Sequence, residues 1–368
     1  MKVTPEIAVK FTKITNCFML IWQPKNKYKK YLFEFLWWFC VIDAFFVLLT
    51  LIGAIIKYSS DTLIAMKTAI FMSGVVNFLI KISITKINRQ YNHEISMKLD
   101  FYLKTANKNQ RIILQNYVDK SWFFHAYMTW SYYIASILFL IGPLFLPQKL
   151  PNDAVYPFST EPLLTFTIIY AQDILVGFQI SAGLVLDCQA ALYLWFSGAL
   201  FEILALEINN IKNYKQLKDY VKKHHDLILF TEKIIKTVSG IAFTTISMTI
   251  IGIVLGSIIL ASNQPATVKL QFTVLVLSAS INILVCARAA DNLIVTSSDV
   301  MVNSLYNFPW YKLSTDAKKI IQIMMQRTQK PITISLSGFV GSLSYQYYAS
   351  FVSTAVSYFT TLRIMLEL

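Results

Sequence analysis

Long stretches without a charged side chain recur along this sequence, and links rich in lysine and arginine separate them. Residues 122–146 and 237–268, for example, contain no Asp, Glu, Lys or Arg. About 20 consecutive apolar residues are enough for a helix to cross the hydrocarbon core of a bilayer. A bilayer offers no water to satisfy exposed backbone amides, so such segments are expected to be helical. The pattern therefore predicts an all-α membrane protein.

Seven transmembrane helices are expected. They span about residues 31–56, 63–84, 122–146, 162–206, 238–261, 270–296 and the segment that follows Pro331. The fourth is roughly twice as long as the hydrocarbon core requires. Because no turn signal divides it, we expect one helix that continues beyond the membrane. Further helices are predicted in the polar link 85–120 and at residues 314–327, where Ser314 is the expected N-cap.

The distribution of basic residues predicts the orientation. With the N-terminus in the cytosol, seven Lys and Arg residues precede the first helix, seven lie in the second-to-third link, seven in the fourth-to-fifth link and six around the sixth-to-seventh link. These are 27 of the 33 basic residues. Basic residues concentrate on the cytosolic side of membrane proteins. The count therefore predicts the N-terminus inside, the C-terminus outside and an odd number of helices.

The sequence offers no catalytic constellation. His93-Glu94 lacks the second histidine of a zinc-protease helix, and neither Cys/His metal spacings nor a Gly-rich phosphate loop occurs. We therefore expect that the protein is not an enzyme and that it holds no cofactor and no metal. The net charge is +13, and the basic residues that cause it lie between the apolar segments. Anionic lipid head groups, rather than nucleic acid, are therefore the expected partner.

Charged residues inside the expected helices have two interpretations. An intramembrane carboxylate such as Asp43 is a candidate functional group, but a hydrogen bond to another helix explains it equally well. Arg288 and Asp291 are three residues apart, so they are expected to pair on one helix face.

The C-terminal segment is uncharged from Pro331 to residue 362, yet it is rich in Ser, Thr and Tyr. Hydroxyl groups are unfavourable against lipid, so this segment is expected to face protein or water. One interpretation is a buried helix packed through small residues. The other is a helix that lines a pore when several chains assemble.

Three blocks near the C-terminus resemble the insect odorant receptors, which are seven-helix ligand-gated cation channels. They are Arg327-Thr-Gln-Lys-Pro331, Ser357-Tyr-Phe-Thr-Thr-Leu-Arg363 and Trp310-Tyr311. The resemblance covers about the last sixty residues, and the rest of the chain matches in layout. It implies a division into residues 1–306, with helices one to six and the ligand-binding bundle, and residues 307–368, with a cytosolic anchor helix and the pore-lining seventh helix.

The resemblance also implies a closed apolar cavity in the outer half of helices two to six, suited to a small volatile ligand. Ordinary core packing is the alternative interpretation for each residue there. The candidate ligand-binding residues are Met66, Ile70, Phe71, Tyr133, Ile137, Leu140, Phe166, Tyr170, Asp173, Phe272 and Leu275.

In the resembled family, the gate lies about one helical turn past the tyrosine of the Ser-Tyr-Phe block. On one face of the last helix this selects Ser357, Thr361, Ile364 and Met365. An apolar ring of Ile364 and Met365 from several chains would close a pore by dewetting. Arg363 departs from this pattern, because a ring of cations facing the lumen would oppose cation flow. The Arg363 side chain is therefore expected to point toward the head groups or a neighbouring chain.

The resemblance implies the tuning subunit of an odorant-gated channel, assembled as a heterotetramer with a shared co-receptor in the plasma membrane of a sensory neuron dendrite. A gustatory receptor-type channel is the nearest alternative. Members of that family end in Thr-Tyr, five apolar residues and Gln-Phe, whereas Tyr358 is followed six positions later by Ile364 and Met365. A heptahelical G-protein-coupled receptor is the alternative from another class, and its orientation is opposite. For a membrane transporter, no inverted repeat stands out.

Overall fold

The computed structural model describes residues 3–22, 26–144, 149–336 and 341–367. The regular elements in these ranges are all helices. The first half holds α1 (Pro5–Thr15), η1 (Cys17–Met19), α2 (Lys27–Lys57), α3 (Thr62–Ile87), α4 (Arg89–Thr105), α5 (Lys108–Leu140) and η2 (Gly142–Leu144). The second half holds α6 (Leu163–Glu207), η3 (Ile208–Asn210), α7 (Tyr214–Ala261), α8 (Ala266–Val295), η4 (Thr296–Val300), α9 (Met301–Asn307), η5 (Trp310–Lys312), α10 (Thr315–Thr328) and α11 (Tyr345–Glu367).

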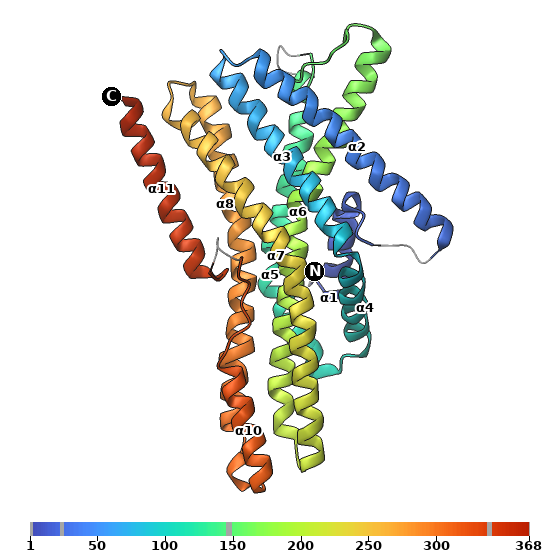
Figure 1. Cartoon of the computed structure of the whole chain (residues 1–368), viewed down its shortest axis with the longest axis vertical. Coiled ribbons are helices and arrows are strands. Elements are labelled where there is room, and N and C mark those ends of the chain that lie inside the picture. The colour runs from blue at the N-terminus through green and yellow to red at the C-terminus, as the bar shows by residue number, and fades with distance from the viewer. Residues whose placement is uncertain (1–2, 23–25, 145–148, 337–340, 368) are drawn as a thin grey trace.

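The helices form an elongated bundle, with α6 and α7 running through most of its length (Figure 1). The α2–α3 and α7–α8 turns lie at the upper end of the view, and the α6–α7 turn and α10 lie at the lower end. Following the predicted orientation, we call these the outer and inner ends. At the left edge of the view, α11 runs outward to the C-terminus beside α8.

Five of the helical segments are long and apolar enough to cross a membrane, counting only the described residues. They are Lys27–Lys57, Thr62–Ile87, Leu163–Asn210, Tyr214–Ala261 and Val268–Asn307. The third and seventh expected spans correspond to parts of α5 and α11, in which Tyr, Trp, Ser and Thr lower the hydropathy. The all-helical membrane fold is confirmed, whereas the count of seven spans stays a prediction.

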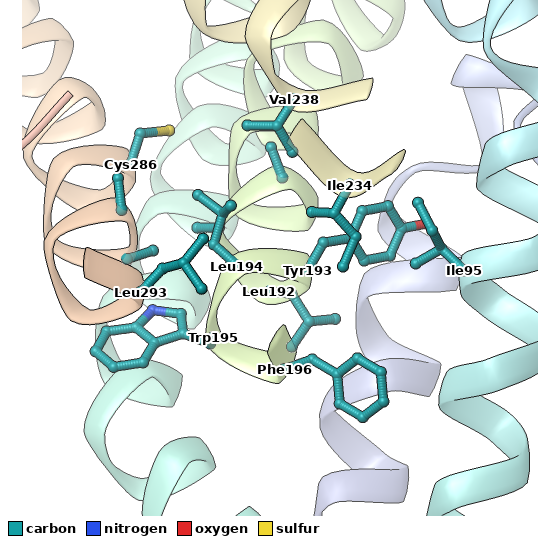
Figure 2. Packing of buried hydrophobic residues seen from close by; sticks show 14 of the residues in the cluster. Ile95, Leu192, Tyr193, Leu194, Trp195, Phe196, Ile234, Val238, Cys286 and Leu293 are labelled. Atoms are coloured by element: carbon teal, nitrogen blue, oxygen red, sulfur yellow. The ribbon is translucent and has the colours of Figure 1, made fainter. Parts of the chain in front are cut away.

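The core is built around α6, which packs against α3, α5, α7 and α8. From Val185 to Ala205 nearly every side chain of this helix is buried, aromatic ones included (Figure 2). Glycine permits close approach at two points. A Cβ on Gly183 would lie 3.3 Å from the Cα of Phe78 on α3, and one on Gly198 would lie 2.5 Å from the Nδ2 of Asn292 on α8. Small residues at such contacts are how membrane helices pack closely.

Polar side chains define where several helices begin. Asn107 and Gln110 form a capping box at the start of α5. Asn213 accepts a hydrogen bond from the amide of Gln216 at the start of α7. Ser314 holds the N-cap position of α10, as expected, but its side chain makes no capping hydrogen bond.

The expected fourth span is one uninterrupted helix, α6, as predicted. The polar links before the third and fifth expected spans are not separate from those spans, because α5 and α7 each continue without a break from the link into the apolar segment. The predicted end of the third span at Leu146, and Pro147 at the start of the following loop, lie outside the described residues.

The last helix begins later than expected. The uncharged run after Pro331 predicts a helix from there, whereas α11 starts at Tyr345. Ser344 explains this start, because its Oγ accepts a hydrogen bond from the amide of Tyr347 at 3.3 Å. The described residues before α11, 331–336 and 341–344, are not helical: the amide of Leu343 donates to the carbonyl of Ile334, and the amide of Ile332 donates to Ser297 Oγ.

A π-helical turn, Thr296–Val300, joins α8 to α9, so the chain continues in helical form from Ala266 to Asn307. Ser297, which accepts the hydrogen bond from Ile332, lies in this turn. The segment that leads to α11 is therefore attached to the one irregular turn of this helical column.

Candidate ligand site, buried ion pair and pore helix

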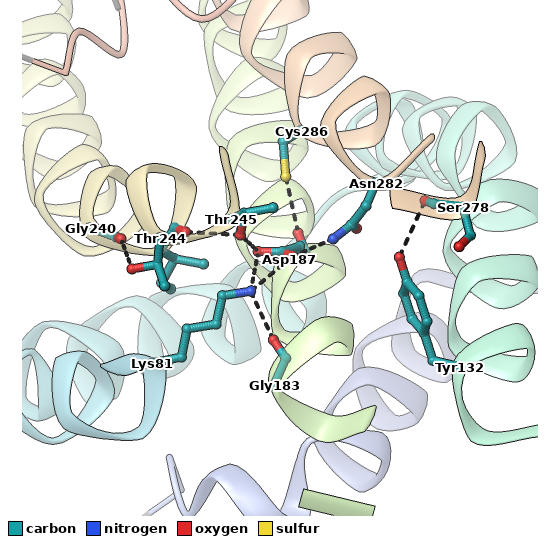
Figure 3. Close-up of polar contacts among 11 residues, drawn as sticks. Lys81, Tyr132, Gly183, Asp187, Gly240, Thr244, Thr245, Ser278, Asn282 and Cys286 are labelled. Carbon is teal, nitrogen blue, oxygen red and sulfur yellow. Dashed lines mark hydrogen bonds and ion pairs between the residues drawn. The ribbon is translucent and has the colours of Figure 1, made fainter. Parts of the chain in front are cut away.

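A buried ion pair connects α3 and α6. The Nζ of Lys81 lies 2.9 Å from Oδ2 and 3.0 Å from Oδ1 of Asp187, and it also donates to the carbonyl oxygen of Gly183 at 2.9 Å (Figure 3). Both side chains are fully buried. A lone charge in this position would be very unfavourable, so the two residues depend on each other.

Two more helices bind the same carboxylate. The Oγ1 of Thr245 on α7 donates to Asp187 Oδ1 at 2.7 Å, and the Nδ2 of Asn282 on α8 donates to Oδ2 at 2.5 Å (Figure 3). Asp187 therefore has hydrogen-bonded contacts with α3, α7 and α8 at one level of the bundle. The carboxylate and the ammonium are both paired, whereas Oδ1 of Asn282 is buried without a hydrogen-bond partner among the described residues. The arrangement is that of a structural cross-link.

Two further carboxylates lie closer to the outer end. Gln172 Nε2 on α6 donates to Asp43 Oδ1 on α2 at 2.9 Å, which agrees with the hydrogen-bond interpretation of Asp43. Asn152 Nδ2, in the loop before α6, donates to Asp173 Oδ1 at 2.6 Å. The second oxygen of Asp173 is buried and has no hydrogen-bond partner among the residues that the structure describes. It is a polar group that a ligand donor would satisfy.

Three of the predicted ligand-binding residues come together between α5 and α6. Tyr170 Oη donates to the carbonyl oxygen of Leu140 at 2.6 Å, and the ring centroids of Phe166 and Tyr170 are 6.0 Å apart. Phe71 on α3 stacks on Phe139 of α5, with centroids 5.1 Å apart. In this outer region a ring pair connects α3 with α5, and the Tyr170 hydroxyl connects α6 with α5.

The other predicted ligand residues are more dispersed. Tyr133 donates its hydroxyl to the carbonyl oxygen of Thr15 at 2.5 Å, so it contacts the N-terminal segment. Ile137 is exposed on α5, and Phe272 is buried on α8. Met66, Ile70 and Leu275 are half-buried. The assignment of these residues to a ligand cavity stays a prediction.

The predicted pore residues share one exposed face of α11. Ser357 and Thr361 are exposed, and Ile364 and Met365 are 61% and 66% exposed. The first turns of α11 pack on α7 and α8, where Tyr347, Tyr348 and Phe351 contact the core. An exposed stripe that combines hydroxyl groups with large apolar side chains is available for contact with other chains or with a pore.

Arg288 and Asp291 do not form the expected pair. The Arg288 guanidinium lies over the rings of Phe124 and Trp195, at 5.0 and 5.9 Å from their centroids. Asp291 accepts a hydrogen bond from the amide of Tyr345 at 3.3 Å, at the start of α11. Each residue therefore interacts with groups on neighbouring helices rather than with the other residue three positions away on α8.

Sequence reasoning missed the Lys81 cluster. Lys81 is an isolated cation in an apolar segment, and Asp187 is one of several acids in the long fourth segment. An isolated intramembrane charge that needs a partner of opposite sign is the signal that would have paired them. The contributions of Thr245 and Asn282 carry no such signal, because Thr and Asn occur throughout these helices.

Comparisons with known proteins agree with this architecture. A family model described as 7tm Odorant receptor matches residues 61–356. The structure of the insect olfactory receptor OR5 from Machilis hrabei in complex with eugenol matches with a TM-score of 0.77 at 14% identity, over 97% of this chain and 98% of that one. A second structure of this receptor, described without eugenol, matches with a TM-score of 0.78 at 15% identity, over the same shares of both chains. No curated protein matches the sequence.

Proposed function

The chain belongs to the 7tm odorant receptor family, and on this premise we propose that it is the odorant-binding subunit of an odorant-gated, non-selective cation channel. The family match over residues 61–356 is the observation that carries the proposal. The channel would be a heterotetramer with a shared co-receptor, in the plasma membrane of a sensory neuron dendrite.

The proposed ligand is a small volatile molecule that is largely apolar. The Phe71–Phe139 and Phe166–Tyr170 ring pairs supply apolar and aromatic surface in the outer region of the bundle. Asp173 adds one buried oxygen that lacks a partner among the described residues. Apolar walls with a few polar groups are typical of small-molecule sites. A ligand with one hydrogen-bond donor would fit this combination best.

We propose that α11 lines the pore. In this arrangement Ile364 and Met365 close the pore as an apolar ring, and Thr361 is the polar neighbour on the same face. Ligand binding would shift the population from the closed to the open arrangement of α11. The exposure of this stripe in the single chain supports the proposal.

The proposed membrane arrangement has seven helices, the N-terminus inside and the C-terminus outside. The concentration of basic residues in the N-terminal segment and in three links supports it. Residues 1–306 would hold the ligand-binding helices, and residues 307–368 the cytosolic anchor helix α10 and the pore helix α11.

Whole-cell recording tests the proposal. Cells expressing this chain with an odorant co-receptor are exposed to a panel of volatile compounds, and cells expressing either protein alone are the controls. We expect a cation current that needs both chains and that changes with substitution of Thr361 or Ile364. Current from this chain alone would contradict the heteromeric assembly.

Topology is tested in the same cells with an epitope placed after the C-terminus. Staining of intact cells is expected, because the C-terminus would lie outside. Staining that appears only after permeabilisation would overturn the channel arrangement and favour a G-protein-coupled receptor.

A further inference from the structure

A small pocket lies where α5, α6 and α8 meet the first residue of α11. Its volume is about 130 Å³, and its lining includes Ser121, Phe124, His125, Trp195, Arg288 and Tyr345. It is separate from the outer aromatic region and from the exposed stripe of α11, since none of the residues assigned to those sites lines it.

Arg288 is the only cationic side chain in the lining of this pocket. Its guanidinium carbon lies over the rings of Phe124 and Trp195, at 5.0 and 5.9 Å from the centroids. The nearest acid in sequence, Asp291, is bound to the amide of Tyr345, and no carboxylate pairs with Arg288 within the described ranges. A half-buried guanidinium without an anion is costly in a membrane protein, so such a residue indicates a site for one.

His125 supplies a second, independent indication. Its side chain lines the pocket and is only 5% exposed. Its Nε2 is buried and has no hydrogen-bond partner in the part of the chain that the structure describes. Because buried polar atoms are normally hydrogen-bonded, a ligand oxygen that accepts an N–H from this imidazole would satisfy it.

We propose that this pocket, called here the Arg288 pocket, binds a phosphate-type oxyanion. The guanidinium fork matches the oxygens of a phosphate group in a bidentate arrangement, which is the strongest class of hydrogen-bonded ion pair. His125 would donate one further hydrogen bond from a second helix. The aromatic rings fix the orientation of the guanidinium, so that little side-chain entropy is lost on binding.

The depth of the pocket in the membrane places it where phosphate groups are available. Arg288 lies 22 positions after Ala266, the first residue of α8, which corresponds to roughly 33 Å along the helix. The hydrocarbon core is about 30 Å thick. In the proposed orientation Arg288 therefore lies at the level of the inner-leaflet phosphates. A phospholipid head group and a free phosphate share the chemistry that the pocket recognises.

A bound oxyanion would bridge α5 and α8 next to Tyr345, the first residue of α11. Occupancy of the pocket would thereby bias the position of the proposed pore helix. This regulatory part of the inference rests on the proposed channel function, whereas binding does not.

Binding is tested with the purified full-length chain in neutral detergent. The probe is a fluorescent short-chain phosphatidylinositol 4-phosphate, followed by fluorescence anisotropy. We expect saturable binding, with an affinity at least tenfold lower in R288Q and several-fold lower in H125F. The matched control is K236Q, which removes one exposed cation at a similar depth on α7. Its affinity is expected to change less than twofold.

A third variant, L284W, fills the pocket without changing its charge and is also expected to lose binding. Equal losses in R288Q and K236Q would overturn the proposal, because the probe would then recognise only the basic inner face. Normal binding by L284W would also overturn it.

Competition identifies the source. If millimolar inorganic phosphate displaces the probe and short-chain phosphatidylcholine does not, a free phosphate suffices. If inorganic phosphate leaves the probe bound, the site takes a lipid. Either result supports the proposal only if the R288Q variant also loses affinity for the probe. A chain that binds the probe but gives no odour-evoked current would support this inference and contradict the proposed function.

Discussion

The ammonium of Lys81 on α3 and the carboxylate of Asp187 on α6 are 2.9 Å apart, and both are fully buried in the bundle. These residues are 106 positions apart in the sequence. Thr245 and Asn282 bind the same carboxylate, so the relative positions of four helices depend on one side chain.

Removal of one member of this pair is expected to be strongly destabilising. K81M would leave Asp187 buried without a cation, and the loss is expected to be about 3–5 kcal/mol. The double variant K81M/D187L removes both charges and should recover much of that loss. Thermal stability of the purified protein in detergent measures the effect. K13M is the control, because the Lys13–Asp100 pair is partly exposed and its loss is expected to lower stability by only about 0–1 kcal/mol.

Close packing of α3 on α6 depends on Gly183. A Cβ there would lie 3.3 Å from the backbone of Phe78, so G183V is expected to push the two helices apart and to weaken the Lys81 contacts. A reduced yield of folded protein at the cell surface is the expected readout. Gly252 provides the control, because nothing lies within 4 Å of its added Cβ, and G252A should retain the normal yield.

The stability of the inner part of α7 should depend on pH through His224. Burial in the first place, and the charge of Arg327 in the second, lower the pKa of His224 from an ordinary value of 6.5 to about 4. Below pH 6.5 the unfolded chain therefore binds a proton that the folded chain rejects. Stability is expected to fall as the pH decreases from about 6.5 to 4, by about 3 kcal/mol in total.

Thermal unfolding measured across this pH range checks the His224 prediction. H224L should flatten the dependence, whereas H225Q, at the exposed neighbouring position, should retain it. An unchanged slope in H224L would assign the dependence to another group.

The proposed gate predicts a change in resting current. I364S would replace an apolar ring by a wettable one, so the closed pore should leak and basal current should rise several-fold with the co-receptor present. V356S makes a similar polar change at another exposed position of α11 and should leave basal current unchanged. Equal currents in both variants would remove Ile364 from the gate.

The helices could be predicted from the sequence to the extent that local signals determine them. The absence of a turn signal between Asp173 and Glu202 was enough to predict α6 as one helix. The start of α11 was not predictable in the same way, because an uncharged run after Pro331 does not distinguish an extended segment from a helix. Only the Ser344 cap decides it.

The site was less predictable than the fold. Pairing of Lys81 with Asp187 requires the register between α3 and α6, which no local pattern contains. Tyr133 illustrates the same point, because its hydroxyl contacts Thr15 in a segment more than one hundred residues away. The rotation of each helix about its axis decides which side chains face a cavity. When a helix is apolar on all sides, the spacing of its apolar residues gives almost no information about that rotation.

The π-helical turn at Thr296–Val300 has a consequence for the rotational phase of everything that follows it. Each residue added to or removed from an α-helix turns the subsequent chain by about 100°. The wider π-turn instead takes up one extra residue, so the helix after it is rotated by much less than this angle. The extra residue therefore changes the winding at Ser297, where Ile332 is bound, while the chain continues in helical form into α9.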